Sequence, residues 1–336
     1  MKTIGVLGAG TWGMALARML CNSGHDVTVW SAIGREIDEF SLTRKHPNLP
    51  NMTIPEEIRF TKDVAEVCRQ KDILLFAVPS VFVRSTTATA RAYIPDGQII
   101  VDVAKGIEPD TLFSMSEVIG DELRKDGRHD NVKLVALSGP THAEEVAVDL
   151  PTAIVSACPD LEVASQVQDV FMNTCMRVYT NSDIVGVELC GAMKNIIALA
   201  SGICAGRGYG ANIKAALITR GMAEITRLGT AMGGREQTFS GLAGMGDLIV
   251  TATSEHSRNN RCGRLLGQGM DPAEAVKAVG MVVEGVNALP AAVKLAKLHR
   301  VELPIVMAVN AVVNEGADPR EEVFQLMNRD KKNELP

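Results

Sequence analysis

Short apolar segments alternate with helical patterns through the first half of the chain. The apolar segments are bounded by glycine, proline or charged residues, which predicts β-strands at Thr3–Leu7, Asp26–Trp30, Ile73–Val78, Gln98–Val103 and Val132–Leu137. Between them, apolar residues recur at helical spacing in Thr11–Asn22, Asp63–Arg69 and Phe82–Ala92. Strands that alternate with helices predict a mostly parallel sheet with helices on both faces.

The pattern changes near Asp183. Before it, strands at Thr152–Ser156 and Arg177–Tyr179 and a helix at Leu161–Met172 are expected to extend the sheet. After it, every long pattern is helical, at Ile184–Ala205, Lys214–Leu228, Pro272–Val279 and Val286–Leu298. We therefore expect an α/β domain over residues 1–185 and an all-helical domain over residues 186–336.

Composition narrows the class of protein. The 336 residues are 46% hydrophobic and 22% charged, which is ordinary for a globular protein, and the net charge of −6 disfavours nucleic acid as a partner. The apolar run at 184–205 contains Glu188 and Lys194, so we do not expect a membrane span. The seven cysteines form no C-x-x-C pair, which favours a reducing, cytoplasmic location, and we expect no bound metal.

A glycine-rich motif follows the first strand and opens a helix. Gly8, Gly10 and Gly13 fit G-x-G-x-x-G, in which the glycines permit a tight turn, backbone approach to a pyrophosphate and close packing of helix on strand. The helix N-terminus then supplies free N–H groups for the phosphates. This context predicts a Rossmann domain that binds a dinucleotide; the alternative is a glycine-rich turn without a ligand.

The end of the second strand bears on the choice of cofactor. NAD enzymes typically place an acid there to bind the ribose hydroxyls, but this strand continues with Ser31, Ala32 and Ile33. Ser31 and Arg35 could contact a 2′-phosphate, which favours NADP over NAD. Arg35 and Glu36 could equally form a solvated ion pair.

Two loops follow strands at the edge where ligands bind in open parallel sheets. Lys105 follows the fourth strand and would place a cation over the cleft, although lone lysines usually only add surface charge. Residues 138–143 follow the fifth strand and supply backbone donors and a hydroxyl.

Lys194 lies in an apolar helix with few polar residues. Burial of its ammonium would lower its pKa toward neutrality, as a general base for an alcohol requires. The alternative is a lysine whose side chain extends to the surface. Farther on, Gly241–Asp247 is too rich in glycine for an ordinary helix. The residues 254–261 supply hydroxyl, guanidinium and amide donors suited to a phosphate, or form a polar surface turn.

Taken together, these stretches resemble the bacterial type of the glycerol-3-phosphate dehydrogenase [NAD(P)+] family over nearly the whole chain. The matching stretches are Gly8–Gly13, Phe76–Ser80, Lys105–Gly106, Ser138–Pro140, Gly186–Asn195, Lys214–Gly221, Gly241–Asp247, Ser257–Asn259, Val282–Gly285 and Glu302–Ile305. The bacterial family commonly has Arg or His just after the tryptophan of the second strand, whereas this chain has Ala32 and Ile33 there, with Arg35 displaced.

The resemblance implies reversible hydride transfer between NAD(P)H and dihydroxyacetone phosphate, giving sn-glycerol 3-phosphate for phospholipid synthesis, in a homodimer. Lys194 is the implied proton-transferring residue, with Lys105 and Asp247 as its catalytic companions. The implied substrate contacts are Lys105, Gly139, Thr141, Lys194, Asn195, Asp247, Thr251, Ser257, Arg258 and Asn259. The implied cofactor contacts, beside the glycine-rich loop and residues 31 and 35, are Thr11, Trp12, Lys105, Ala143, Arg258, Val282 and Glu284.

Two other functions fit parts of the pattern. One is a related two-domain dehydrogenase of the 3-hydroxyacid or 6-phosphogluconate type, which would act on those substrates and not on dihydroxyacetone phosphate. The other is a nucleotide sensor without catalysis, which would bind the cofactor and not turn over.

Overall fold

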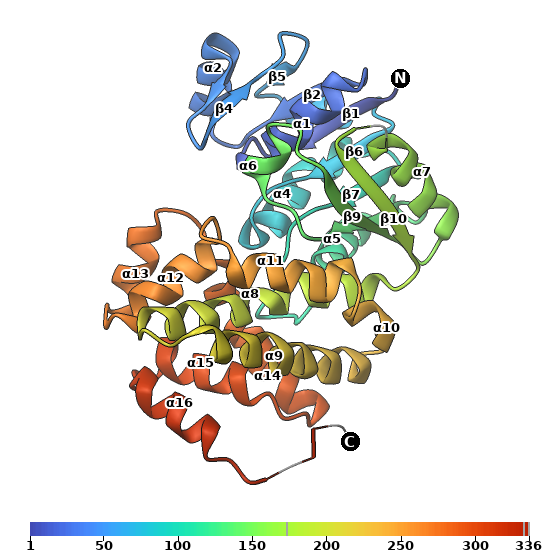
Figure 1. Cartoon of the computed structure of the whole chain (residues 1–336). Helices are drawn as coiled ribbons and strands as arrows, with labels where there is room; N and C mark the ends of the chain where they lie inside the picture. Colours follow the sequence, from blue (N-terminus) through green and yellow to red (C-terminus); the bar gives the residue numbers. More distant parts are fainter. Residues whose placement is uncertain (173, 332, 335–336) are drawn as a thin grey trace.

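An eight-stranded sheet forms the upper half of the molecule and a bundle of helices the lower half in the computed structural model, which describes residues 1–172, 174–331 and 333–334 (Figure 1). The strand order is β10-β9-β8-β7-β6-β1-β2-β5. The neighbouring strands are parallel except for β8 and β9, which are antiparallel. The strands are β1 (Thr3–Leu7), β2 (Asp26–Trp30), β5 (Arg59–Thr61), β6 (Ile73–Phe76), β7 (Ile99–Asp102), β8 (Lys133–Ser138), β9 (Thr152–Ala157) and β10 (Met176–Asn181).

All seven predicted strands are present, and the mostly parallel Rossmann sheet is confirmed. The predictions missed β5 and the small hairpin of β3 (Lys45–His46) and β4 (Leu49–Thr53). These strands are short and mixed in polarity, and β4 contains Pro50, so their sequences carry no clear strand signal.

Helices cover both faces of the sheet. They are α1 (Thr11–Asn22), α2 (Gly34–Thr43), α3 (Val64–Cys68), α4 (Val83–Ala90), α5 (Met115–Arg124), α6 (Ala143–Val146) and α7 (Leu161–Phe171), with short 3-10 helices η1 (Ser80–Phe82) and η2 (Arg91–Tyr93). Two separate clusters of buried aliphatic side chains lie between these helices and the sheet, one on each face.

Only helices occur from residue 184 onward in the described part of the chain. They are α8 (Ile184–Gly206), α9 (Ala211–Ala231), α10 (Glu236–Phe239), the π-helix η3 (Leu242–Gly246), α11 (Asp247–Thr253), α12 (Arg258–Gly267), α13 (Pro272–Val279), α14 (Glu284–His299), α15 (Pro304–Asn314) and α16 (Pro319–Met327). The change from strands to helices thus falls between Asn181 and Ile184. Position 185 as a domain boundary stays a prediction.

Helix α8 is the core of the helical half. Its length and composition would allow it to cross a membrane, but 83% of its most apolar window is buried inside the protein. Helices α9, α11, α12 and α14 surround it (Figure 1). Helix α8 is therefore a core helix.

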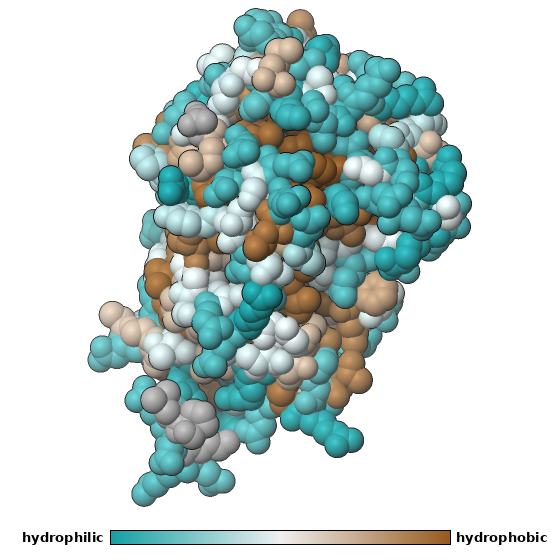
Figure 2. All heavy atoms as spheres, turned by 90° about the vertical axis from the view of Figure 1, so that its right-hand side faces the viewer, coloured by the Kyte–Doolittle hydropathy of each residue, from teal (hydrophilic) through white to brown (hydrophobic). Residues whose placement is uncertain are grey.

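On the face shown in Figure 2, hydrophilic side chains predominate and hydrophobic ones lie in small groups between them.

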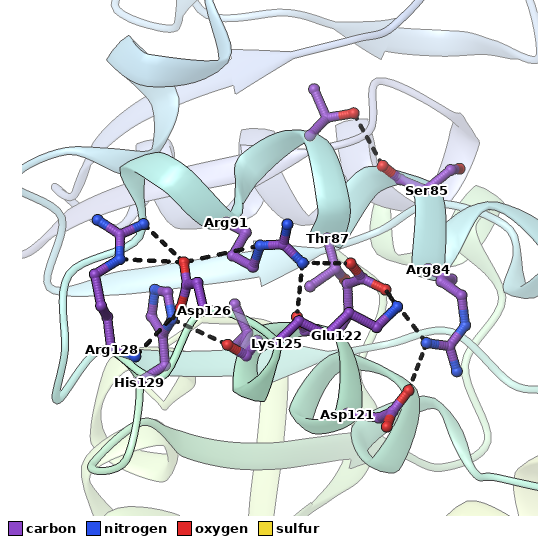
Figure 3. A network of polar contacts seen from close by, with 12 residues as sticks. Arg84, Ser85, Thr87, Arg91, Asp121, Glu122, Lys125, Asp126, Arg128 and His129 are labelled. Atoms are coloured by element: carbon purple, nitrogen blue, oxygen red, sulfur yellow. Dashed lines mark hydrogen bonds and ion pairs between the residues drawn. The ribbon is translucent and has the colours of Figure 1, made fainter.

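An ion-pair network joins α4 and α5 on the outside of the sheet (Figure 3). Glu122 is almost fully buried and accepts from Arg84 at 3.3 Å, Arg91 at 2.7 Å and Lys125 at 2.5 Å. Each cation near it thus has a carboxylate partner. The network fixes these two helices of the sheet layer to each other.

Candidate active site

The dinucleotide loop lies where the strand order reverses, between β1 and β6. Gly8 has φ +119°, and a Cβ there would lie 2.6 Å from the carbonyl oxygen of Ala77. A Cβ on Gly13 would collide with the carbonyl oxygen of Gly8, whereas a Cβ on Gly10 would meet no atom within 4 Å. Gly8 and Gly13 are thus required by the turn, while Gly10 leaves open space where a pyrophosphate can approach the N-terminus of α1.

Beyond the tip of β2, Glu36 turns back toward the strand. The hydroxyl of Ser31 donates to Glu36 Oε2 at 2.7 Å and accepts from the backbone N–H of Ile33 at 3.1 Å. Arg35 is exposed. The structure thus places a carboxylate at the tip that the linear sequence left without one, and no ion pair joins it to Arg35 among the described residues.

Lys194 is 5% exposed and is the centre of a buried polar cluster. Its Nζ donates to Asp247 Oδ1 and to Thr251 Oγ1, the latter at 2.6 Å. Lys105 reaches the same carboxylate from the Rossmann domain and donates to Asp247 Oδ2 at 2.7 Å and to the Gly139 carbonyl at 3.1 Å. One carboxylate therefore joins a lysine of the Rossmann domain to a lysine of α8.

The surroundings of Lys194 change its proton affinity. Its pKa is lowered to about 7: burial is the largest cause, the carboxylate of Asp247 opposes it, and the positive charges of Lys105 and Arg258 add to the lowering. For Asp247, burial acts to raise the pKa, but the two lysines outweigh it and hold the pKa below its usual value. Lys194 can thus exist as an amine or an ammonium near neutral pH.

A π-helical turn positions Asp247. The glycine-rich Leu242–Gly246 forms this turn, and the α-helix resumes at Asp247. A π-turn widens the helix and shifts the residues that follow it, and such turns occur often at functional sites. The predicted departure from an ordinary helix is thus present at Gly241–Asp247, and it directs the carboxylate toward α8.

The predicted phosphate cluster begins α12. Ser257 caps this helix by accepting from the Asn260 N–H at 3.2 Å. Arg258 follows and is partly buried, and its guanidinium makes no hydrogen bond to another described residue. Close packing fixes α12 on α8, because a Cβ on Gly202 or Gly263 would collide with the backbone of the opposite helix. A free guanidinium beside helix N–H groups suits a phosphate.

Asn259 and Asn195 join α12, α8 and α14. Asn259 Nδ2 donates to Asn195 Oδ1 at 2.9 Å, and Asn259 Oδ1 accepts from the Gly285 N–H at 2.8 Å. Asn195 in turn donates to the Gly191 carbonyl at 3.1 Å. Much of the donor capacity predicted for phosphate binding is thus used to hold three helices together, and one N–H of Asn259 remains.

The other predicted residues lie in two groups. Thr141 lies in the β8–α6 loop, where its hydroxyl donates to the Gly139 carbonyl at 3.2 Å, and Ala143 begins α6. Thr11 and Trp12 begin α1 and are partly buried. Val282 precedes α14 and Glu284 begins it.

Sequence reasoning missed a buried carboxyl beneath the Lys105 loop. Asp102 ends β7, is 2% exposed and accepts from the Ala104 N–H at 3.2 Å, whereas its Oδ2 has no hydrogen-bond partner among the described residues. Burial raises its pKa well above the ordinary value, and the charges of Glu188 and Glu284 add to this. Its place at the end of a predicted strand was the only signal. Its hydrogen bond to the Ala104 N–H holds the start of the loop that contains Lys105.

Sequence reasoning also missed a pair of histidines, one from each half of the molecule. His142, from the β8–α6 loop, lies with its ring centre 5.9 Å from that of His256, which precedes α12. Both residues adjoin predicted substrate contacts, and their separation in the chain gave no signal of their contact. The pair brings the β8–α6 loop close to the start of α12.

A Rossmann sheet with an open dinucleotide loop, facing a buried lysine whose pKa is near neutral, defines a two-domain NAD(P)-dependent dehydrogenase. Two family models match the chain: the NAD-dependent glycerol-3-phosphate dehydrogenase N-terminus over residues 3–164 and the C-terminus over residues 183–324. The chain therefore belongs to the NAD-dependent glycerol-3-phosphate dehydrogenase family.

Individual proteins agree with this family. The chain is 71% identical to "Glycerol-3-phosphate dehydrogenase [NAD(P)+] 2" of Lactobacillus delbrueckii subsp. bulgaricus, over 100% of this chain and 99% of that protein. It is 49% identical to glycerol-3-phosphate dehydrogenase [NAD(P)+] of Fusobacterium nucleatum, again over 100% and 99%. The crystal structure of glycerol-3-phosphate dehydrogenase from Coxiella burnetii matches with a TM-score of 0.92 and 36% identity, over 98% of this chain and 99% of that one.

Proposed function

We propose that this protein reduces dihydroxyacetone phosphate to sn-glycerol 3-phosphate with NAD(P)H, reversibly, and so supplies glycerophospholipid synthesis. The observation that carries the proposal is the buried Lys194, held by Asp247 and Thr251 and matched in pKa to proton transfer at neutral pH. The family supplies the substrate. The site supplies a proton donor in Lys194 and a second cation in Lys105 for the ketone, and a free guanidinium in Arg258 for the phosphate.

The proton passes from Lys194 to the ketone oxygen of the substrate. Bound NAD(P)H supplies a hydride to the ketone carbon of dihydroxyacetone phosphate. Lys105 and Lys194 donate hydrogen bonds to the ketone oxygen and polarise the bond. Lys194 then transfers its proton to this oxygen and remains as an amine, which regains a proton from solvent. Asp247 holds both lysines and balances their charge throughout.

The phosphate is held apart from the reacting carbon. Arg258 and the N-terminus of α12 bind it, with Asn259, Ser257 and Thr141 as further donors. Binding of this remote group supplies energy that positions the ketone against Lys194. The dinucleotide loop, Trp12 and Glu284 would hold the cofactor.

Three finer proposals accompany this function. Ser31 and Arg35 favour NADP, on condition that Glu36 moves from the position where a 2′-phosphate would lie. The protein acts in the cytoplasm, in keeping with seven free cysteines in the described chain. It forms a homodimer, as its family resemblance implies, and light scattering of the purified protein measures this directly.

A steady-state assay tests the proposal. Dihydroxyacetone phosphate should be reduced with either NADH or NADPH, and Arg258→Ala should raise its KM at least about tenfold, because a guanidinium–phosphate contact is lost. An unchanged KM in this variant would remove Arg258 from the phosphate site. Turnover of 3-hydroxyacids or 6-phosphogluconate alone, or cofactor binding without turnover, would favour the two rival functions.

A further inference from the structure

Two carboxylates of the helical domain are held by serines of the Rossmann domain. Glu284, the first residue of α14, accepts from the Ser80 N–H at 3.0 Å and from the Ser80 hydroxyl. Glu188, in α8, accepts from the Ser116 N–H at 2.8 Å and from its hydroxyl at 2.6 Å, with Ser114 as a further donor at 2.8 Å. The chemistry of the two contacts is the same, but their positions differ.

The Ser80–Glu284 contact lies at the switch point of the sheet. Ser80 begins η1, after β6, beside the dinucleotide loop. The loop that contains Lys105 lies directly against it, because a Cβ on Gly106 would collide with the Cβ of Ser80 and lie 2.7 Å from its hydroxyl. The same Cβ would lie 3.8 Å from Glu284 Oε2. Any shift of Ser80 or Glu284 therefore changes the base on which the Lys105 loop rests.

A chain of hydrogen bonds leads from the same contact to the phosphate side. Directly after Glu284, the Gly285 N–H donates to Asn259 at 2.8 Å, and Asn259 donates to Asn195, the neighbour of Lys194 in α8. The Ser116–Glu188 contact has no such chain to Asn259 among the described hydrogen bonds. It joins α8 to the N-terminus of α5.

We propose that Ser80 is a positioning residue of the reaction: by holding Glu284 across the domain junction, it sets both the Lys105 loop and Asn259 in their working geometry. This inference rests on the proposed roles of Lys105 and Asn259. Ser80 itself need not touch the substrate, because it acts through Glu284 on one side and through Gly106 on the other. Ser116–Glu188 is then a structural joint between the same two domains.

The test compares matched serine variants of the full-length protein. Ser80→Ala should lower kcat/KM for dihydroxyacetone phosphate about ten- to hundredfold, because small displacements of catalytic groups have effects of this size. Ser116→Ala removes the same kind of hydrogen bond and should lower Tm by about as much as Ser80→Ala does. Its kcat and both KM values should stay within about twofold of the wild type. If Ser80→Ala changes only Tm, as Ser116→Ala is expected to, the proposal is overturned.

A double-mutant cycle tests whether Ser80 acts through Glu284. Adding Ser80→Ala to Glu284→Ala should cause less than about twofold further loss of kcat/KM, because the two residues form one unit. Losses that multiply would show that Ser80 acts independently, which contradicts the proposal. The wild-type assay separates the two levels: a wild type that does not reduce dihydroxyacetone phosphate refutes the proposed function, whereas an active wild type with an unaffected Ser80→Ala refutes only this inference.

Discussion

Asp247 and Lys105 should shift the pH dependence of catalysis in opposite directions. The carboxylate of Asp247 favours the ammonium form of Lys194, and the charge of Lys105 disfavours it. Asp247→Asn should therefore lower the pKa of Lys194, and Lys105→Met should raise it. A general loss of structure would not produce shifts of opposite sign.

The geometry sets the size of these shifts. Asp247 is hydrogen-bonded to Lys194, and two unit charges about 4 Å apart interact by about 4 kcal/mol at an effective dielectric constant of about 20. At 1.36 kcal/mol per pKa unit, the upper limit for Asp247→Asn is about 3 units. Lys105 is bonded to the other oxygen of Asp247, so its effect on Lys194 should be smaller, about 1 unit.

The assay is the pH profile of kcat/KM in both directions. Reduction requires the ammonium and should decline above about pH 7 in the wild type, and oxidation of glycerol 3-phosphate requires the amine and should rise through the same range. The pH at the inflection of each profile is compared between variants, so that a lower overall rate does not affect the comparison. Asp183→Asn is the control, since Asp183 caps α8 about 16 Å along the helix from Lys194. Equal shifts in both variants, or no shift, would refute this reasoning.

Three further predictions concern other parts of the molecule. Glu224 accepts from the Ile305 and Val306 N–H groups, and burial raises its pKa to about 7 from 4.5, so its contribution to stability is present below about pH 4.5 and lost as the pH rises through 7. Relative to Glu224→Gln, the wild-type free energy of unfolding should thus fall by about 3 kcal/mol over this pH range. Urea denaturation at each pH measures this, and a difference between the two proteins that stays constant with pH would contradict it. Glu122→Gln should cost about 1–3 kcal/mol of stability, because Lys125 loses its carboxylate partner and Arg84 and Arg91 each lose one of theirs. The cost should be smaller in 1 M NaCl, which thermal unfolding measures, and an unchanged Tm would show that Glu122 contributes nothing. Glu36→Gln should lower the KM for NADPH several-fold more than that for NADH, because it removes a negative charge where a 2′-phosphate would lie; an equal effect on both would place the 2′-phosphate elsewhere.

Much of the fold follows from local pattern. The strand bounds Thr3–Leu7 and Asp26–Trp30 and the helix Thr11–Asn22 agree with the structure to the residue, because apolar period and glycine boundaries determine them locally. The reversal of β9 relative to β8 is different. Strand direction depends on how a connection returns to the sheet, and residues 138–152 contain only a short helix that gives no signal of it.

The candidate site divides in the same way. Burial of Lys194 could be predicted from the apolar residues around it. Its partner Asp247 lies 53 positions away, and Glu284 lies 204 positions from Ser80, so only the packing of helices onto the sheet brings these pairs together. Glu36 shows the converse: the sequence places it six residues beyond Trp30, yet the turn into α2 returns its carboxylate to Ser31.

The most direct test of the account is Lys194→Ala. The variant should reduce dihydroxyacetone phosphate with a kcat at least about a thousandfold below the wild type, because the proton donor is lost, while its Kd for NAD(P)H, measured by fluorescence, stays within about twofold. Lys297→Ala, at an exposed lysine of α14, should leave both values unchanged. A kcat for Lys194→Ala within tenfold of the wild type would contradict the assignment of Lys194 as the proton-transferring residue.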